Sequence, residues 1–95
     1  MMKIVTLCGA GLGTSAILKL GVERALEALN LDAEVIASDI ASVTELAADA
    51  QVILTSGELL HRIGRTFAEI IVIDNYLDQA EISAKIERAL GRDAV

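Results

Sequence analysis

The sequence predicts an α/β fold, a three-layer sandwich in which a four-stranded parallel sheet carries helices on both faces. Short runs of aliphatic residues alternate along the chain with segments whose apolar residues recur at helical spacing. Hydrophobic residues make up 54% of a chain that has one Phe, one Tyr and no Trp, so the core must be aliphatic. At 95 residues there is room for one domain, which we expect to span residues 1–95.

Each expected strand is an apolar run that ends at a turn or loop signal. The strands are expected at residues 3–7, 33–37, 51–54 and 69–73, and helices from Thr14 or Ser15 to about residue 29 and at 42–48, 58–63 and 78–90. Thr14 or Ser15 is the expected N-cap of the first helix. Ser42 and Glu45 fit a capping box, and Asn30 is the expected stop of the first helix.

Composition excludes several classes of function. The formal net charge of −6 leaves no basic stripe to meet a nucleic acid or an anionic membrane surface. No apolar run approaches the length of about 18 residues that a membrane span needs, so we expect no membrane insertion. One cysteine cannot form an internal disulfide, and one Cys with one His is too few for a zinc site. A reducing cytoplasm is the setting that this cysteine count predicts, and we expect no metal.

Ligands of parallel sheets bind beyond the carboxyl ends of the strands. The segment expected there after the first strand reads Cys8-Gly9-Ala10-Gly11-Leu12-Gly13-Thr14-Ser15. Its glycines let backbone N–H groups approach a ligand closely, and the following helix N-terminus adds partial positive charge. These features predict a phosphate-binding loop and a lowered pKa of Cys8 that favours the thiolate. The alternative for Cys8 is a small buried apolar residue.

Three better-known loops fit this segment less well. The P-loop of NTPases needs a Lys, and none lies in the segment. A dinucleotide fingerprint needs its third glycine at position 14, which is Thr14. A phosphatase loop needs an arginine six positions after its cysteine, and that position is also Thr14. Without an arginine to clamp the phosphoryl oxygens, a phosphate is held but not rapidly hydrolysed, so the pattern favours a carrier over a phosphatase.

The segment 8–15 after an N-terminal strand resembles the IIB subunit of the bacterial sugar phosphotransferase system, in particular the ascorbate and galactitol types. The likeness extends over nearly the whole chain, with Lys19 in the first helix and Thr55 and Ser56 after the third strand. It implies a four-stranded parallel sheet flanked by helices, as in low-molecular-weight phosphatases. The ascorbate type is favoured over the galactitol type.

The resemblance also implies a relay. Cys8 would accept a phosphoryl group from a phosphohistidine of the IIA protein and pass it to a sugar held by the membrane subunit IIC. N–H groups of residues 9–15 and the hydroxyls of Thr14 and Ser15 would hold the phosphate, and Leu12 would lie on an apolar docking rim. Thr55 and Ser56 would line the site if the third strand neighbours the first. No cofactor is expected, because both donor and product are activated phosphoryl compounds.

The relay places the protein in the cytoplasm, peripherally associated with the membrane transporter subunit. Two alternatives stay open on the same fold. One is an enzyme like the low-molecular-weight phosphatases, and the other is a IIB-like regulatory module.

Overall fold

The computed structural model describes residues 2–7, 12–64, 66–75 and 77–90, and for residues 12–15 and 61 it describes the backbone. In chain order the elements are β1 (Met2–Leu7), α1 (Leu12–Ala28), β2 (Ala33–Ser38), α2 (Val43–Leu46), β3 (Val52–Thr55), the 3₁₀ helix η1 (Gly57–Arg62), β4 (Glu69–Val72) and α3 (Gln79–Leu90). The four strands and the helical segments that the sequence predicts are all present, with ends that differ by a few residues at most.

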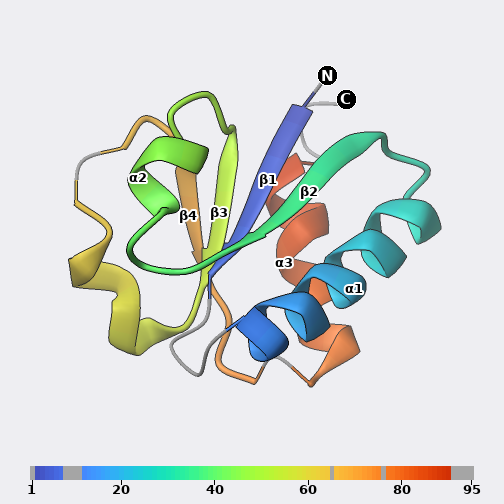
Figure 1. Cartoon of the computed structure of the whole chain (residues 1–95). Helices are drawn as coiled ribbons and strands as arrows, with labels where there is room; N and C mark the ends of the chain where they lie inside the picture. Colours follow the sequence, from blue (N-terminus) through green and yellow to red (C-terminus); the bar gives the residue numbers. More distant parts are fainter. Residues whose placement is uncertain (1, 8–11, 65, 76, 91–95) are drawn as a thin grey trace.

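The four strands form one parallel sheet in the order β2-β1-β3-β4. The first strand is therefore central, and its last residue, Leu7, is paired with Ser38 of β2 and with Thr55 of β3. All four strands run toward the lower part of the view in Figure 1. Their carboxyl ends therefore meet at one edge of the sheet, which we call the carboxyl edge.

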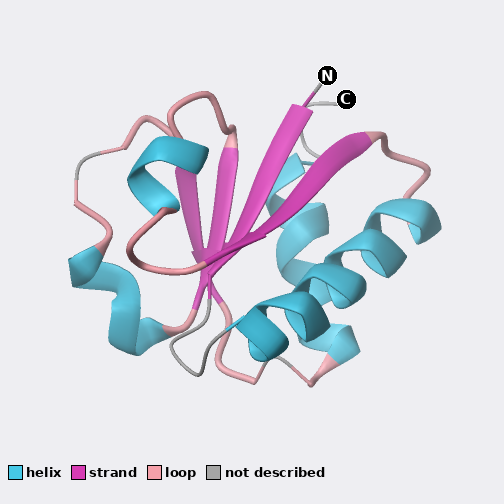
Figure 2. Ribbon diagram, in the orientation of Figure 1, coloured by secondary structure: helices cyan, strands magenta, loops and turns pink. Residues whose placement is uncertain are grey.

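Helices cover both faces of the sheet, as Figure 2 shows, with α1 and α3 on one face and α2 and η1 on the other. Alternate residues of the central strand point into different cores. Ile4 packs in the core beneath α1 and α3, with residues such as Leu18 and Ile82, and Val5 packs in the core beneath α2 and η1. Both residues are fully buried. The predicted three-layer α/β sandwich is confirmed.

The first helix ends as predicted but begins earlier than predicted. Asn30 adopts a φ of 58°, and the N–H groups of Asn30 and Leu31 donate to the carbonyls of Glu27 and Leu26 at 3.1 and 2.9 Å. This pattern is a Schellman motif, in which a left-handed residue stops the helix. At the other end the helix begins at Leu12, so the prediction of an N-cap at Thr14 or Ser15 is wrong.

Local geometry also corrects two short helices. Ser42 is the N-cap of α2, but its backbone is helical (φ −102°, ψ −9°) and its side chain makes no capping bond, so the capping box is wrong. The carboxylate of Asp39 accepts the N–H of Ser42 at 2.9 Å instead. The helix predicted at 58–63 is a 3₁₀ helix, whose first turn includes a bond from the N–H of Leu59 to the carbonyl of Ser56.

Candidate functional site

The candidate site lies where the central strand ends. Cys8 directly follows Leu7, and α1 begins four residues later at Leu12. The intervening residues, Cys8, Gly9, Ala10 and Gly11, lie outside the described residues, so their predicted roles stay predictions. The described residues that bracket this segment are Leu7, which lies between the ends of β2 and β3, and Leu12, which begins the first turn of α1.

The first turn of α1 contributes backbone donors. An α-helix leaves its first N–H groups without an acceptor inside the helix, and in α1 these belong to Leu12, Gly13 and Thr14. No acidic residue lies in this turn. The partial positive charge at the start of this 17-residue helix is therefore not opposed locally, and an anion is favoured there.

Hydroxyl side chains lie at the ends of both strands that flank β1. Thr55 and Ser38 are buried, and each hydroxyl donates to the carbonyl of the next residue, Thr55 to Ser56 at 3.2 Å and Ser38 to Asp39 at 3.0 Å. Thr55 was a predicted rim residue, and its hydroxyl proton is already used by the backbone. Ser38 lies level with Thr55 on the other side of Leu7. The sequence places Ser38 at the end of the second expected strand and so at this edge, but only the strand order shows that it lies directly beside Leu7.

Ser56, the other predicted rim residue, differs from these two. Its Oγ atom is buried and has no hydrogen-bond partner among the residues that the structure describes. The structure therefore distinguishes Thr55 from Ser56, although both were expected at the rim of the site.

Carboxylates at the carboxyl edge serve the turns there. Asp39 caps α2, and Asp74 lies 3.8 Å from the amine of Lys85. Glu81 accepts the backbone N–H groups of Asp74 and Asn75 at 2.7 and 3.0 Å. The hydrogen bond from Lys85 at 2.7 Å, together with these N–H groups, lowers the pKa of Glu81. Glu81 and Lys85 thus hold the turn between β4 and α3, whereas Asp39 serves the start of α2.

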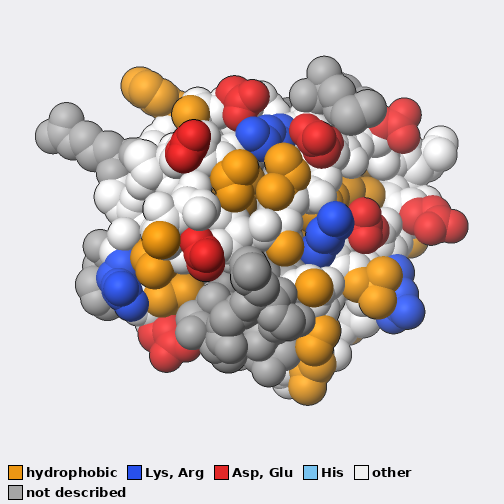
Figure 3. All heavy atoms as spheres, viewed as in Figure 1, with side chains coloured by type: hydrophobic (Ala, Val, Ile, Leu, Met, Phe, Trp, Pro, Cys, Tyr) orange, Lys and Arg blue, Asp and Glu red, His pale blue; other side chains and the backbone are white. Residues whose placement is uncertain are grey.

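Several large apolar side chains are exposed around the same edge. Ile17 and Leu20 lie in the first half of α1, Leu60 in η1 and Leu77 between β4 and α3. The side chain of Leu12, the predicted rim residue, lies outside the described part of the chain. On the side of the molecule seen in Figure 3, hydrophobic side chains are scattered among acidic and basic ones.

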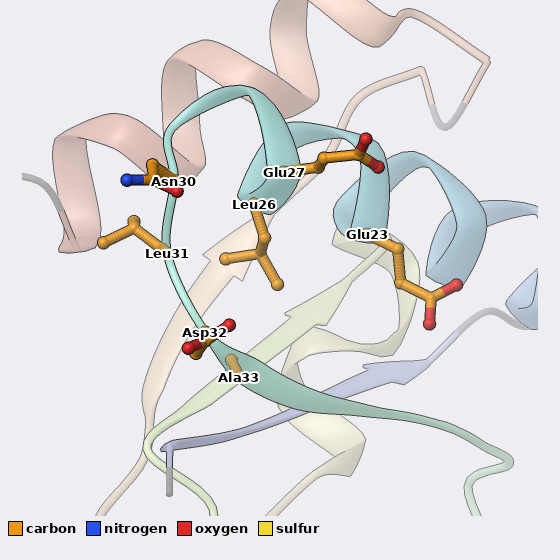
Figure 4. A pocket seen from close by; sticks show the side chains of 7 residues that line it. All are labelled: Glu23, Leu26, Glu27, Asn30, Leu31, Asp32 and Ala33. Carbon is orange, nitrogen blue, oxygen red and sulfur yellow. The ribbon is translucent and has the colours of Figure 1, made fainter.

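A hollow of about 290 Å³ lies at the opposite edge of the sheet, between the last turns of α1 and the start of β2. Figure 4 shows its lining, with Leu26 between the helix and the strand. Three of its lining residues, Glu23, Glu27 and Asp32, are acidic and would repel a phosphate. This hollow is therefore not the predicted phosphate site.

Two further observations limit the chemistry. Within the described ranges, His, Cys, Asp and Glu side chains form no group of three or more that could hold a metal ion. Within the same ranges, no helix has the length and apolar character needed to cross a membrane. The chemistry that the described residues support is anion binding by the backbone N–H groups at the start of α1, close in sequence to Cys8, and such helix N-termini are typical of α/β proteins that handle phosphoryl groups.

Comparisons with known proteins agree with this class. The family model described as "PTS system, Lactose/Cellobiose specific IIB subunit" matches residues 3–88. The chain is 28% identical over 90 residues to the ascorbate-specific PTS system EIIB component of Mycoplasma pneumoniae, covering 94% of this chain and 95% of the relative. The lactose-specific IIB component domain of Streptococcus pneumoniae has the same fold, with a TM-score of 0.63 at 16% identity, covering 98% of this chain and 94% of that chain.

The chain belongs to the family of IIB subunits of the sugar phosphotransferase system. It is a phosphoryl-transfer component of such a system, in the general class of phosphotransferases. The predicted resemblance to a IIB subunit is confirmed.

Proposed function

We propose that residues 1–95 form a phosphoryl carrier and that Cys8 is the residue that carries the phosphoryl group. The observation that supports this is the position of Cys8 in the chain. It directly follows Leu7, the last residue of the central strand, and comes four residues before the start of α1. A nucleophile placed there lies near a helix N-terminus, which favours both a thiolate and a bound phosphate.

The proposed first step is transfer from a phosphohistidine of the IIA protein. The Cys8 thiolate attacks phosphorus, an S–P bond forms, the N–P bond breaks, and the electron pair of that bond returns to the imidazole nitrogen. In the second step a sugar hydroxyl oxygen attacks phosphorus, the S–P bond breaks and the thiolate is restored. The hydroxyl proton leaves to a base or to water on the acceptor side. Such transfer depends mainly on positioning and electrostatics.

The proposed phosphate site is the segment 9–15, which comprises Gly9, Ala10, Gly11, Leu12, Gly13, Thr14 and Ser15. The N–H groups at the start of α1 support it. Position 14 is Thr14 and not arginine, so we expect the phosphocysteine to be held and not rapidly hydrolysed. Thr55 and Ser56 lie at the rim.

The proposed partners are the phosphorylated IIA protein and the membrane subunit IIC, which the chain would meet in turn in the cytoplasm, at the membrane surface. We propose an ascorbate-type sugar acid as the final acceptor. The named specificity of the Mycoplasma pneumoniae relative supports this choice. The phosphorylated chain should lose its phosphoryl group faster to membranes that carry an ascorbate-type IIC than to membranes that carry a lactose-type or galactitol-type IIC. The reverse order of rates would exclude an ascorbate-type acceptor.

The test of the carrier role is intact-mass measurement after incubation with phosphorylated IIA. The wild-type chain should gain one phosphate, and Cys8→Ser should gain none. The matched control is His61→Gln, since His61 is the only histidine and the obvious competing acceptor. This variant should gain phosphate as the wild type does. Phosphate that remains on Cys8→Ser, or a wild type that takes none, would refute the role of Cys8.

A further inference from the structure

Ser56 lies one residue beyond the end of β3 and continues its direction. Thr55 is paired with Leu7, and Ser56 has an extended backbone (φ −79°, ψ 155°). In a parallel pair, one step along both strands keeps neighbours level with each other. Ser56 therefore comes one step after the last described pair, Leu7 with Thr55, as Cys8 follows Leu7 in the sequence.

Alternation along β3 predicts the face to which Ser56 belongs. Leu54 packs in the core beneath α1 and α3, whereas Ile53 packs in the core beneath α2 and η1. Side chains two residues apart on an extended chain share a face. Ser56 therefore shares the face of Leu54, which is the face that α1 covers, and Thr55 shares the other.

The Ser56 hydroxyl is also chemically available. Its Oγ atom is buried, makes no capping bond to η1, and has no hydrogen-bond partner in the described part of the chain. Buried polar atoms normally have a partner, because burying an unpaired hydroxyl opposes folding. The hydroxyls of Ser38 and Thr55 follow this rule by donating to backbone carbonyls. Ser56 is the exception, and it lies on the face where α1 begins.

We infer that Ser56 donates its hydroxyl proton to a non-bridging oxygen of the phosphoryl group on Cys8, and that Thr55 and Ser38 do not. This inference rests on the proposed function. A hydroxyl donor stabilises the negative charge that develops on the phosphoryl oxygens in the transition state. The Ser56 hydroxyl would do so effectively because it is already positioned and shielded from water. The same hydroxyl costs stability in the unphosphorylated protein, since its Oγ atom is buried without a partner among the described residues.

The inference predicts opposite effects on activity and stability. In Ser56→Ala the rate of phosphoryl acceptance from IIA should fall about tenfold or more, the loss expected for a hydrogen bond to a charged group. The midpoint of urea unfolding should stay the same or rise, because an unpaired buried hydroxyl is removed. Ser56→Thr keeps the hydroxyl and should retain most of the wild-type rate.

The matched control is Ser38→Ala, the same substitution on the other flank of β1. It should lower stability, because the hydrogen bond to the carbonyl of Asp39 is lost. After the rate is corrected for the fraction of folded protein, phosphoryl acceptance should stay within about twofold of wild type, since no donor to the phosphate is removed. Inorganic phosphate gives a readout that needs no partner protein. Its binding, followed by amide chemical shifts of residues 12–14, should weaken in Ser56→Ala and not in Ser38→Ala.

The results separate the two proposals. If wild-type protein takes no phosphate, the carrier role fails, and the role of Ser56 fails with it. If wild type is phosphorylated and Ser56→Ala matches its rate, only the role of Ser56 is overturned. A Ser56→Ala variant that loses stability and activity together would also overturn it, because the hydroxyl would then have a structural partner.

Discussion

The contact between α1 and α3 allows a quantitative test of the packing. Gly21 lies inside α1, and a Cβ atom built on it would stand 2.9 Å from Cδ1 of Ile82 and 3.3 Å from Oε1 of Gln79. The amide of Gln79 donates to the carbonyl of Gly21 at 2.9 Å. Ile82 is 1% exposed, so its end methyl has little room to move away. Glycine at position 21 therefore lets the two helices approach closely.

Two opposing effects set the result of Gly21→Ala. Replacing glycine by alanine inside a helix gains about 1 kcal/mol. Forcing one methyl into a packed contact costs about 1–3 kcal/mol. We expect a net loss of roughly 0–2 kcal/mol in the free energy of unfolding. Ile82→Val, which removes the Cδ1 methyl, should by itself cost about 0.5–1.5 kcal/mol.

The double variant is the decisive measurement. With Cδ1 gone, the new methyl at position 21 fits, so Gly21→Ala with Ile82→Val should be more stable than the sum of the single losses by about 1 kcal/mol or more, a coupling typical of residues in contact. Free energies would come from urea unfolding followed by circular dichroism. Ile86→Val is the control, because Ile86 is buried on the same helix but lies beyond 4 Å of the built Cβ. A coupling at Ile82 no larger than that at Ile86 would refute the reasoning.

Two other predictions concern the carboxylates of the turns. Asp39→Ala should cost about 1 kcal/mol of stability, as the loss of a capping bond does. Ser42→Ala should be nearly neutral, because the Ser42 side chain makes no capping bond. If both variants lost the same stability in urea unfolding, Ser42 would be a capping residue after all. The pKa of Glu81 is lowered by the Lys85 bond and two backbone N–H groups, so its stabilisation is complete above its unfolded pKa of about 4.3 and is lost as pH falls through the folded value. Glu81→Gln should therefore cost more stability at pH 7 than at pH 3, and a cost independent of pH would contradict this assignment.

The layers of the fold could be predicted because both faces of the strands are apolar. Ile4 and Val5 are neighbours in sequence, yet both are fully buried, each in a different core. A strand that is apolar on both faces has to be covered on both, which requires a parallel sheet with helices on either side. The same physics explains why the strand positions agree closely with the sequence pattern.

Helix starts were harder to predict because capping depends on backbone angles as well as residue types. Ser42 has the right side chain for a cap but a helical backbone, whereas a capping side chain works from an extended one. Thr14 also has a favourable type, and it lies inside α1. A capping preference of about 1 kcal/mol is too small to fix where a helix begins when the connection from the preceding strand decides it.

The candidate site depends on strand order, which local patterns do not contain. From the sequence, Ser38, Thr55 and Ser56 are simply hydroxyls at strand ends. The order β2-β1-β3 places two of them level with Leu7, on either side of it. Backbone geometry then determines which hydroxyl is available. Ser38 and Thr55 donate to the next carbonyl, whereas the hydroxyl of Ser56, one step further along an extended chain, has no hydrogen-bond partner among the residues that the structure describes. The hydrogen bond missing at Ser56, more than the presence of serine there, is the reason to expect it to meet a phosphate.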